Sequence, residues 1–213
     1  ASHQLRTPLT ALRLRLENLE SAPGAATDEL ASAIAEADRL SHVVEELLVL
    51  ARTDGSRPER AVIDLTPLVE DRLDAWQPLA RDHGVSLRWD DATARDARGW
   101  RAVACPGHVE QILDNLLANA LNATGPGGTV SVAIDRSHDD VEVRVRDTGH
   151  GMRAEERLRA FDRFWRSDTS IAGGTGLGLA IVAQLVRASG GTCWLDASPT
   201  GGIDAVVRLP VPR

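Results

Sequence analysis

Leucine spacing dominates the first fifty or so positions of the chain. Five leucines recur at alternating steps of four and three, the spacing of a heptad seam along one helix: Leu5, Leu9, Leu12, Leu16 and Leu19. Pro23 and Gly24 interrupt this pattern, and a second apolar seam runs from Leu30 to Ala51. Two seams joined by a short turn predict an antiparallel helical hairpin over residues 1–57.

A lone hairpin of about 50 residues cannot cover two apolar stripes by itself. We therefore expect this hairpin to dimerise and to form half of a four-helix bundle. A hairpin packed on the remainder of its own chain is the alternative that the pattern leaves open.

The polar segment Asp54–Arg60, which contains Gly and Pro, predicts a linker, and residues 58–213 follow as a second domain. Strict alternation of valines and isoleucine around Ser137–Asp140 predicts a β-hairpin. The remaining pattern predicts helices at Thr66–His83, Pro106–Ala123, Ala154–Trp165 and Gly176–Ser189, and strands at Ala61–Leu65, Val85–Trp89, Trp100–Ala104, Thr192–Ala197 and Ile203–Leu209. The fold class is therefore α+β, with a helical hairpin followed by an α/β sandwich.

Composition narrows the possible functions. The 24 basic residues are all Arg and face 31 acidic residues, so the net charge is −7 and nucleic acid is not an expected partner. The absence of Lys excludes a Walker A loop and a pyridoxal Schiff base. Cys105 and Cys193 are far apart and predict reduced, packed thiols. No apolar run is long enough to cross a bilayer, and the chain begins on helical sequence, so we expect a soluble part of a longer protein.

The first candidate for chemistry is the segment Ser2–Leu9, SHQLRTPL. At about 100° per residue, His3 lies about 160° from Leu5, which is nearly opposite the leucine seam. An outward imidazole on a rigid bundle is accessible to a macromolecule, and its neutral nitrogen is a competent nucleophile. Pro8 removes the helical hydrogen bond to the Gln4 carbonyl and kinks the helix just after His3. Because this kink is costly, it favours a functional role for His3 over that of an ordinary surface histidine.

A second candidate lies in the helix predicted at Pro106–Ala123. Asn115 and Asn119, at positions i and i+4, share the face opposite the apolar residues Val109, Ile112, Leu113, Leu116 and Ala120. Their amide oxygens can coordinate a hydrated Mg²⁺ that also holds phosphate oxygens. Two ordinary surface asparagines are the alternative for this pair taken alone.

Two glycine motifs complete the set. In DTGHGM, Asp147 can accept a hydrogen bond from an exocyclic amine while Gly149 and Gly151 permit close backbone approach, although such a motif also fits a simple turn. GGTGLGL, at residues 173–179, opens a predicted helix whose N-terminal N–H groups suit phosphate. A dinucleotide-binding loop is disfavoured here because no strand leads into this segment.

The outward histidine, the asparagine pair, DTGHGM, the FDRFWR stretch and GGTGLGL occur in an order that resembles the two-component sensor histidine kinases. The similarity is to a HisKA-type dimerisation domain followed by a GHKL (Bergerat-fold) ATP-binding domain. It implies that His3 is the phosphoacceptor and that Asn119 ligates Mg²⁺ beside Asn115. It further implies that Asp147, with Gly149 and Gly151 beside it, recognises the adenine base. The same resemblance places two further sets of residues at the nucleotide: Phe161, Phe164 and Arg166 of the F box, and Gly174, Thr175, Gly176, Leu177 and Gly178 of the phosphate-binding loop.

This resemblance also implies partners and a location. The γ-phosphoryl group of ATP passes to His3 and then to an Asp in the receiver domain of a response regulator, within a homodimer. The chain would be the cytoplasmic portion of a membrane-anchored sensor. Gln4 stands where the family usually has an acidic candidate base, Thr7 matches a position linked to phosphatase activity, and Asn122 and Ala123 replace a basic and an aromatic residue. A GHKL ATPase without histidine transfer and a degenerate kinase acting as phosphatase or scaffold are the rival interpretations.

Overall fold

The computed structural model describes residues 59–90, 100–137, 139–167 and 175–212. All of these belong to the unit Arg52–Arg213, which contains the second predicted domain. The helical hairpin predicted over residues 1–57 lies outside the described residues, and so do His3, Gln4 and Thr7.

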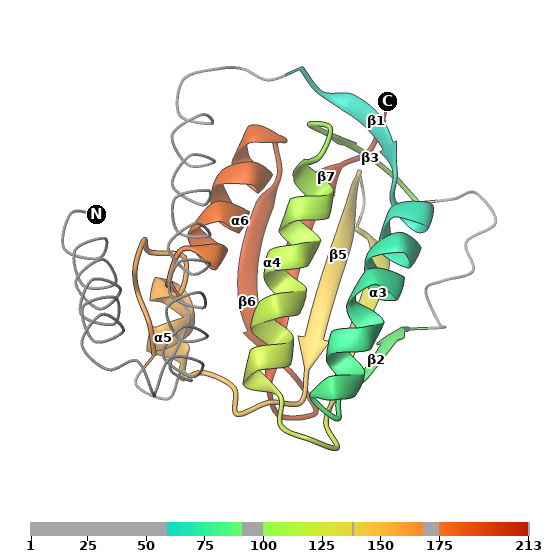
Figure 1. The fold of residues 1–213 in the computed structure, drawn as a ribbon. Helices are drawn as coiled ribbons and strands as arrows, with labels where there is room; N and C mark the ends of the chain where they lie inside the picture. Colours follow the sequence, from blue (N-terminus) through green and yellow to red (C-terminus); the bar gives the residue numbers. More distant parts are fainter. Residues whose placement is uncertain (1–58, 91–99, 138, 168–174, 213) are drawn as a thin grey trace, which may run out of the picture. The chain divides into compact units, whose positions relative to one another are not determined.

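Alternating apolar and polar residues build a five-stranded sheet in the order β2-β4-β5-β7-β6 (Figure 1). Its strands are β2 (Ser86–Trp89), β4 (Thr129–Ser137), β5 (Asp140–Asp147), β6 (Thr192–Ala197) and β7 (Ile203–Pro210). Only the β2–β4 pair is parallel. The predicted hairpin is confirmed, with Ile134 opposite Val143 and Val132 opposite Val145 in an antiparallel register.

Two short strands, β1 (Ala61–Asp64) and β3 (Arg101–Ala104), form a separate antiparallel pair. The side chain of Asp64 accepts a hydrogen bond from the Thr66 N–H and so caps the following helix, α3 (Leu65–Asp82). This cap fixes the point at which the chain leaves β1 and enters the helical layer.

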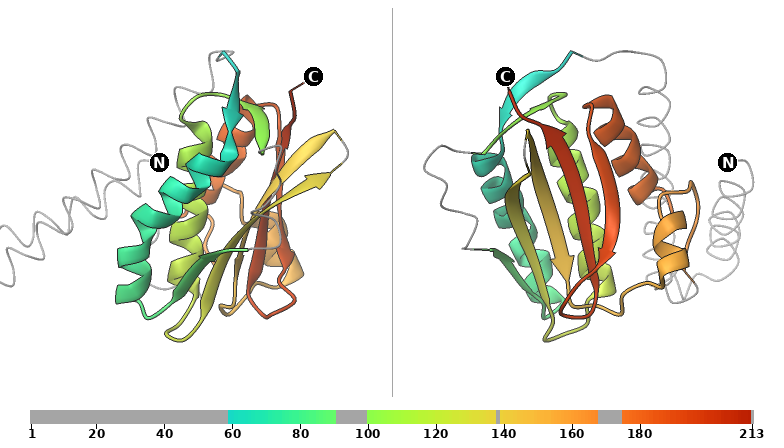
Figure 2. Two further views of the ribbon diagram at one scale, coloured as in Figure 1. Left: turned by 90° about the vertical axis from the view of Figure 1, so that its right-hand side faces the viewer. Right: turned by 180° about the vertical axis from the view of Figure 1, so that it is seen from behind.

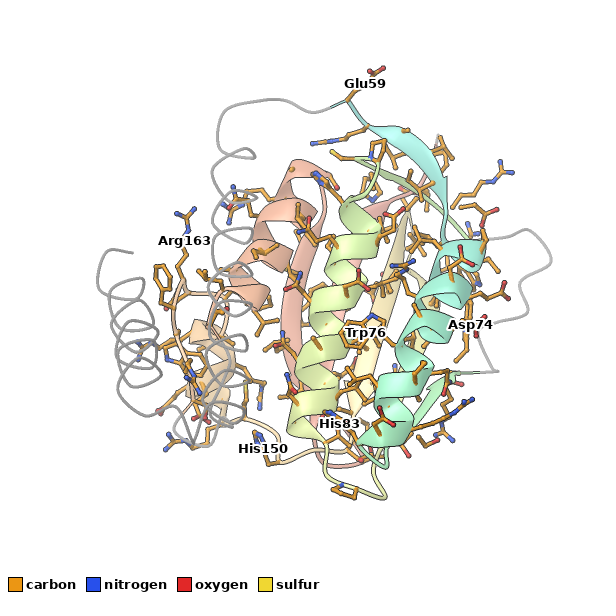
Figure 3. The ribbon with its side chains drawn as sticks, in the orientation of Figure 1. Glu59, Asp74, Trp76, His83, His150 and Arg163 are labelled. Carbon is orange, nitrogen blue, oxygen red and sulfur yellow. The ribbon has the colours of Figure 1, made fainter. Side chains whose placement is uncertain are left out.

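Three helices cover one face of the five-stranded sheet: α3, α4 (His108–Ala123) and α6 (Gly178–Ala188) (Figures 1 and 2). Trp76 projects from α3 toward α4, where its Nε1 donates to Asp114 Oδ1 at 2.8 Å (Figure 3). None of the described helices combines the length and the apolar composition needed to cross a membrane.

The core lies between the helices and the sheet. The apolar face predicted for α4 is confirmed, because Val109, Ile112, Leu113, Leu116 and Ala120 are all buried. Burial of each such leucine or isoleucine contributes about 1.5–3 kcal/mol to folding. Asn115 and Asn119 are left on the less buried side of this helix. Cys105 is buried and Cys193 half-buried, and both are free thiols, as predicted.

The other face of the sheet carries a network of charged side chains. Asp204 Oδ2 accepts from Arg144 Nη1 at 2.7 Å and from Arg146 Nε at 3.0 Å. Glu142 pairs with Arg144 and with Arg208, whose guanidinium lies 4.9 Å from the Trp194 ring centroid. A cavity of about 590 Å³ opens on this face beside Arg88, Arg146 and Asp204.

Two helices are shorter in the structure than the sequence predicts. α5 spans Ala154–Arg159 rather than Ala154–Trp165, because the chain turns at Asp162 and Phe164 adopts a φ of +68°, which no α-helix accommodates. α6 begins at Gly178 rather than Gly176, because Gly176 has a φ of +72°. The other boundaries agree to within about two residues, the usual spread of helix and strand ends.

Candidate functional site

The asparagine pair on α4 faces the glycine loop that precedes α6. A Cβ placed on Gly178 would lie 2.9 Å from Asn115 Oδ1 and 3.7 Å from Asn119 Nδ2. Asn115 also donates from Nδ2 to the Gln111 carbonyl at 2.9 Å, which orients its amide. The structure therefore brings together two motifs that the sequence separates, and Gly178 keeps the space between them open.

Asp147, the last residue of β5, has a buried carboxylate held by two backbone donors. Its Oδ1 accepts from the Gly149 N–H at 2.8 Å, and its Oδ2 accepts from the Ile203 N–H at 3.2 Å. Burial raises the pKa of Asp147 above its ordinary value of 3.8, while the bonds from Gly149 and Ile203 act in the opposite direction. The two backbone donors hold the carboxyl oxygens in place as acceptors, which suits recognition of an amine.

Gly149 must be glycine because the end of α4 packs directly on it. A Cβ there would lie 2.7 Å from the Ala123 carbonyl carbon and would also collide with the carbonyl oxygen. Gly151 follows with a φ of +68°. The DTGHGM turn is therefore fixed against α4, and His150 projects from it at the exposed edge of the domain (Figure 3).

The F-box segment, residues 161–167, is joined by its backbone to the glycine loop that precedes α6. Phe164 N–H donates to the Gly176 carbonyl at 2.8 Å. A Cβ on Gly176 would lie 2.9 Å from both the Phe164 carbonyl carbon and the Trp165 carbonyl oxygen. Phe161 and Phe164 are half-buried, whereas Arg166 is exposed.

The loop before α6 is anchored by its own residues. Thr175 Oγ1 accepts from the Leu177 N–H at 3.2 Å, and the Leu177 side chain is fully buried. α6 has no side-chain cap at its N-terminus, so its first N–H groups can bind an anion. Gly174, the first predicted residue of this loop, lies outside the described residues.

Sequence reasoning missed three side chains that connect these motifs. Glu156 on α5 accepts a hydrogen bond from the Ser167 hydroxyl at 2.7 Å. Arg157 donates from Nη1 at 2.7 Å to the carbonyl of Met152, the last residue of DTGHGM. A Glu three positions after a helix N-cap is a capping-box signal, but the N-cap here is Arg153 rather than Ser or Thr, which hides it.

The residues present suit a magnesium nucleotide. Asn115 and Asn119 offer amide oxygens, the hard ligands that Mg²⁺ accepts while it keeps several waters and phosphate oxygens. Within the described ranges, no three His, Cys, Asp or Glu side chains are clustered as a protein-only metal site. Two amide oxygens fill only part of the octahedral coordination of Mg²⁺, so a metal held at α4 would also take oxygen ligands from water or the nucleotide.

Family comparisons assign both parts of the chain. Residues 105–213 match the family described as "Histidine kinase-, DNA gyrase B-, and HSP90-like ATPase". Residues 1–56 match the family described as "His Kinase A (phospho-acceptor) domain". The two matches follow one another in the order that the sequence motifs predict.

Individual relatives agree with these matches. The chain is 37% identical, over 99% of its length, to the "Probable sensor histidine kinase TcrY" of Mycobacterium tuberculosis. It is 36% identical, over 95% of its length, to the "Signal transduction histidine-protein kinase/phosphatase MprB" of Mycolicibacterium smegmatis. The chain spans less than half of these relatives, 44% and 42% of their lengths.

Among solved structures, one titled "Crystal structure of ShkA full-length in complex with AMPPNP" is similar, with a TM-score of 0.71 and 26% identity. The similarity covers 87% of this chain and 39% of that one.

Proposed function

The chain belongs to the sensor histidine kinase family, and from this premise we propose that it transfers the γ-phosphoryl group of ATP to its own His3. In this proposal residues 1–57 form the dimerising phosphotransfer hairpin and residues 58–213 form the ATP-binding domain. The observation that carries it is the meeting of Asn115 and Asn119 with Gly178 at the junction of α4 and α6.

Each motif has a part in holding ATP. Asp147 accepts a hydrogen bond from the exocyclic amine of adenine, and Gly149 and Gly151 let the ring approach the backbone. The backbone of residues 174–178 binds the phosphates, supported by the N-terminus of α6. Phe161, Phe164 and Arg166 border the phosphate end. Asn119, beside Asn115, ligates Mg²⁺, which supplies charge neutralisation at the phosphates.

In the transfer step, a nitrogen of the His3 imidazole attacks the γ-phosphorus. The bond between that phosphorus and the bridging oxygen breaks, and ADP leaves with the electron pair. The ring loses its proton to solvent or to a neighbouring acceptor, for which Gln4 offers only an amide oxygen. Since phosphoryl transfer depends mainly on positioning and charge neutralisation, the missing carboxylate slows this step rather than abolishing it.

The phosphoryl group then passes to an Asp in the receiver domain of a response regulator. Thr7 follows His3 by four positions, one turn of the predicted helix, and is proposed to orient water when the regulator is dephosphorylated. The relative MprB is named a kinase/phosphatase, which supports both the transfer to the regulator and its dephosphorylation. We further propose that the chain acts as a homodimer and as the cytoplasmic portion of a membrane-anchored sensor, because the family resemblance implies both.

The test is incubation of the chain with γ-labelled ATP and Mg²⁺. The label is expected to be lost in acid and to survive base, the behaviour of a phosphohistidine. His3→Gln should abolish labelling, whereas substitution of a histidine outside these motifs, His83→Gln at the end of α3, should leave it intact.

Equal labelling of the His3→Gln variant and the parent would refute the proposal. A chain that hydrolyses ATP without taking up label would instead favour a GHKL ATPase that lacks histidine transfer. A chain that binds ATP with neither activity would favour the degenerate, scaffold-like alternative.

A further inference from the structure

One carboxylate joins the start of α5 to the end of the F-box segment. Glu156 Oε1 accepts from the Ser167 hydroxyl at 2.7 Å, and Glu156 Oε2 accepts from the Arg153 backbone N–H at 2.8 Å. Both side chains are covered, with the Glu156 side chain 12% exposed and Ser167 8% exposed. A short hydroxyl–carboxylate bond of this kind is about twice as strong as a neutral hydrogen bond.

The segment between these contacts is also held at a second point. Phe164 N–H donates to the Gly176 carbonyl at 2.8 Å, so residues 161–167 are fixed to the glycine loop on one side and to α5 on the other. The same helix contacts the DTGHGM turn through the bond from Arg157 to the Met152 carbonyl. α5 therefore links the residues around Asp147 to those around Arg166.

The Glu156 carboxylate is ionised throughout the neutral range. The Ser167 hydroxyl, followed by the backbone and side chain of Arg153, lowers the pKa of Glu156 from 4.5 to about 2. The acceptor in the Glu156–Ser167 bond is thus a full negative charge at any pH used to assay a kinase.

We propose that Glu156 is a positioning residue for phosphoryl transfer. By holding Ser167, it fixes the Trp165–Ser167 stretch, and with it Arg166, beside the glycine loop at Gly176. The inference rests on the proposed ATP-dependent transfer to His3. A purely structural role of the bond would make the transfer rate and the nucleotide affinity fall together. A positioning role lowers the rate alone, because the adenine contact at Asp147 lies on β5 and is not held by Ser167.

Ser167→Ala tests this role because it removes the bond to Glu156 and leaves the Glu156–Arg153 cap in place. Single-turnover labelling by γ-labelled ATP should slow about tenfold, the equivalent of one charge-assisted hydrogen bond. Calorimetry should show unchanged ADP affinity. Ser167→Thr, which keeps the hydroxyl, should restore the rate, and Glu155→Gln on the exposed side of α5 should match the parent.

A double-mutant cycle adds a second criterion. Glu156→Gln alone should slow labelling, and it should slow it much less when Ser167 is already Ala, because the two side chains act through one bond. Additive effects, a parent rate in Ser167→Ala, or equal losses of rate and ADP affinity would each overturn the positioning role.

A readout independent of activity is the fluorine NMR signal of 5-fluorotryptophan at Trp165, assigned by Trp165→Phe among the five tryptophans. Ser167→Ala should shift or broaden this signal and leave the other four unchanged. An unchanged Trp165 signal contradicts the proposed contact whatever the kinetics. A parent chain that takes up no label contradicts the proposed function itself, and with it any role in transfer.

Discussion

The backbone N–H of Phe164 donates to the Gly176 carbonyl, and both residues lie in the left-handed region, with φ values of +68° and +72°. Left-handed backbone is unfavourable for a side chain as bulky as Phe. Residues in such conformations persist where surrounding contacts determine them, and they are concentrated at ligand-binding and switch regions. The pairing of two such residues marks the junction of the F-box segment and the glycine loop as a constrained part of the site.

Gly176→Ala should therefore destabilise this junction strongly. The new Cβ would require left-handed backbone and would press on the Phe164 carbonyl carbon and the Trp165 carbonyl oxygen, both at 2.9 Å. We expect the free energy of unfolding to fall by about 2–4 kcal/mol and ATP binding to weaken. Urea denaturation measures the first effect and calorimetry the second.

Gly127→Ala is the matched control. Gly127 has a φ of +83°, but nothing lies within 4 Å of a Cβ built on it. This variant should lose only about 1 kcal/mol, the conformational part of the cost. Equal losses in the two variants would show that contact with the F-box segment is not what requires glycine at position 176.

The two asparagines of α4 allow a second prediction. Asn119→Ala should reduce Mg²⁺-dependent labelling by about 10²-fold or more, because removal of one catalytic electrostatic contact typically costs this much. ADP affinity without Mg²⁺ should change little. Asn122→Ala, at an exposed position of the same helix, is the control and should behave as the parent. Loss of ADP binding in the absence of metal would place Asn119 at the nucleotide rather than at Mg²⁺.

Asp147→Asn should weaken ADP binding about 10–100-fold at neutral pH, the value of a hydrogen bond to a charged group. Isothermal calorimetry measures this directly. Asp162→Asn, at an exposed carboxylate of the F-box segment, should retain parent affinity. Unchanged affinity in Asp147→Asn would exclude the proposed adenine contact.

The pH dependence of Asp147 provides a further check on the same prediction. Because burial raises the pKa of Asp147, the folded protein takes up a proton at a higher pH than an ordinary Asp. The folding contribution of this group is favourable below 3.8 and is lost as pH rises through its folded pKa. Nucleotide recognition has the opposite dependence, since it needs the carboxylate. The affinity advantage of the parent over Asp147→Asn should therefore shrink as pH falls.

Much of the fold could be predicted from periodicity. The α4 face and the β4–β5 hairpin depend on local alternation between apolar and polar residues, which any window of the sequence displays. The end of α5 could not be found in this way. Apolar spacing continues through Phe161, Phe164 and Trp165, and the helix stops because Phe164 pairs with Gly176, a contact that only the folded chain makes.

The candidate site shows the same division. The motifs and their order predicted which residue types would bind a magnesium nucleotide, and their role in binding stays a prediction. Their meeting could not be read from the sequence, because Asn115 reaches Gly178 only through the packing of α4 on α6. Likewise, the second donor to Asp147 is the N–H of Ile203, a backbone group that no residue type signals.

On the other face of the sheet, Asp204 allows a prediction about stability. Its side chain is 7% exposed and accepts from both Arg144 and Arg146. Asp204→Ala removes a buried acceptor that both guanidiniums share, while Glu142 still pairs with Arg144, and it should cost about 1–3 kcal/mol of unfolding free energy. Asp135→Ala, at a 44% exposed carboxylate 3.6 Å from Arg144, should cost less than about 0.5 kcal/mol. Similar losses in urea denaturation would show that the network acts through surface charge alone.

The last prediction concerns Gln4, which follows the proposed phosphoacceptor and lies outside the described residues. A carboxylate beside the imidazole would hold the proton on one ring nitrogen and leave the other free to attack. The Gln4 amide oxygen can still accept that hydrogen bond, but it carries no charge and is far less basic, so orientation survives while proton acceptance weakens. General-base assistance is worth about 10²–10⁴-fold, and phosphoryl transfer depends on it less than other reactions do. Gln4→Glu should therefore speed single-turnover labelling of His3 by about 10²-fold or less. A rate equal to or below that of the parent would mean that proton acceptance does not limit transfer, and that positioning of the γ-phosphate does.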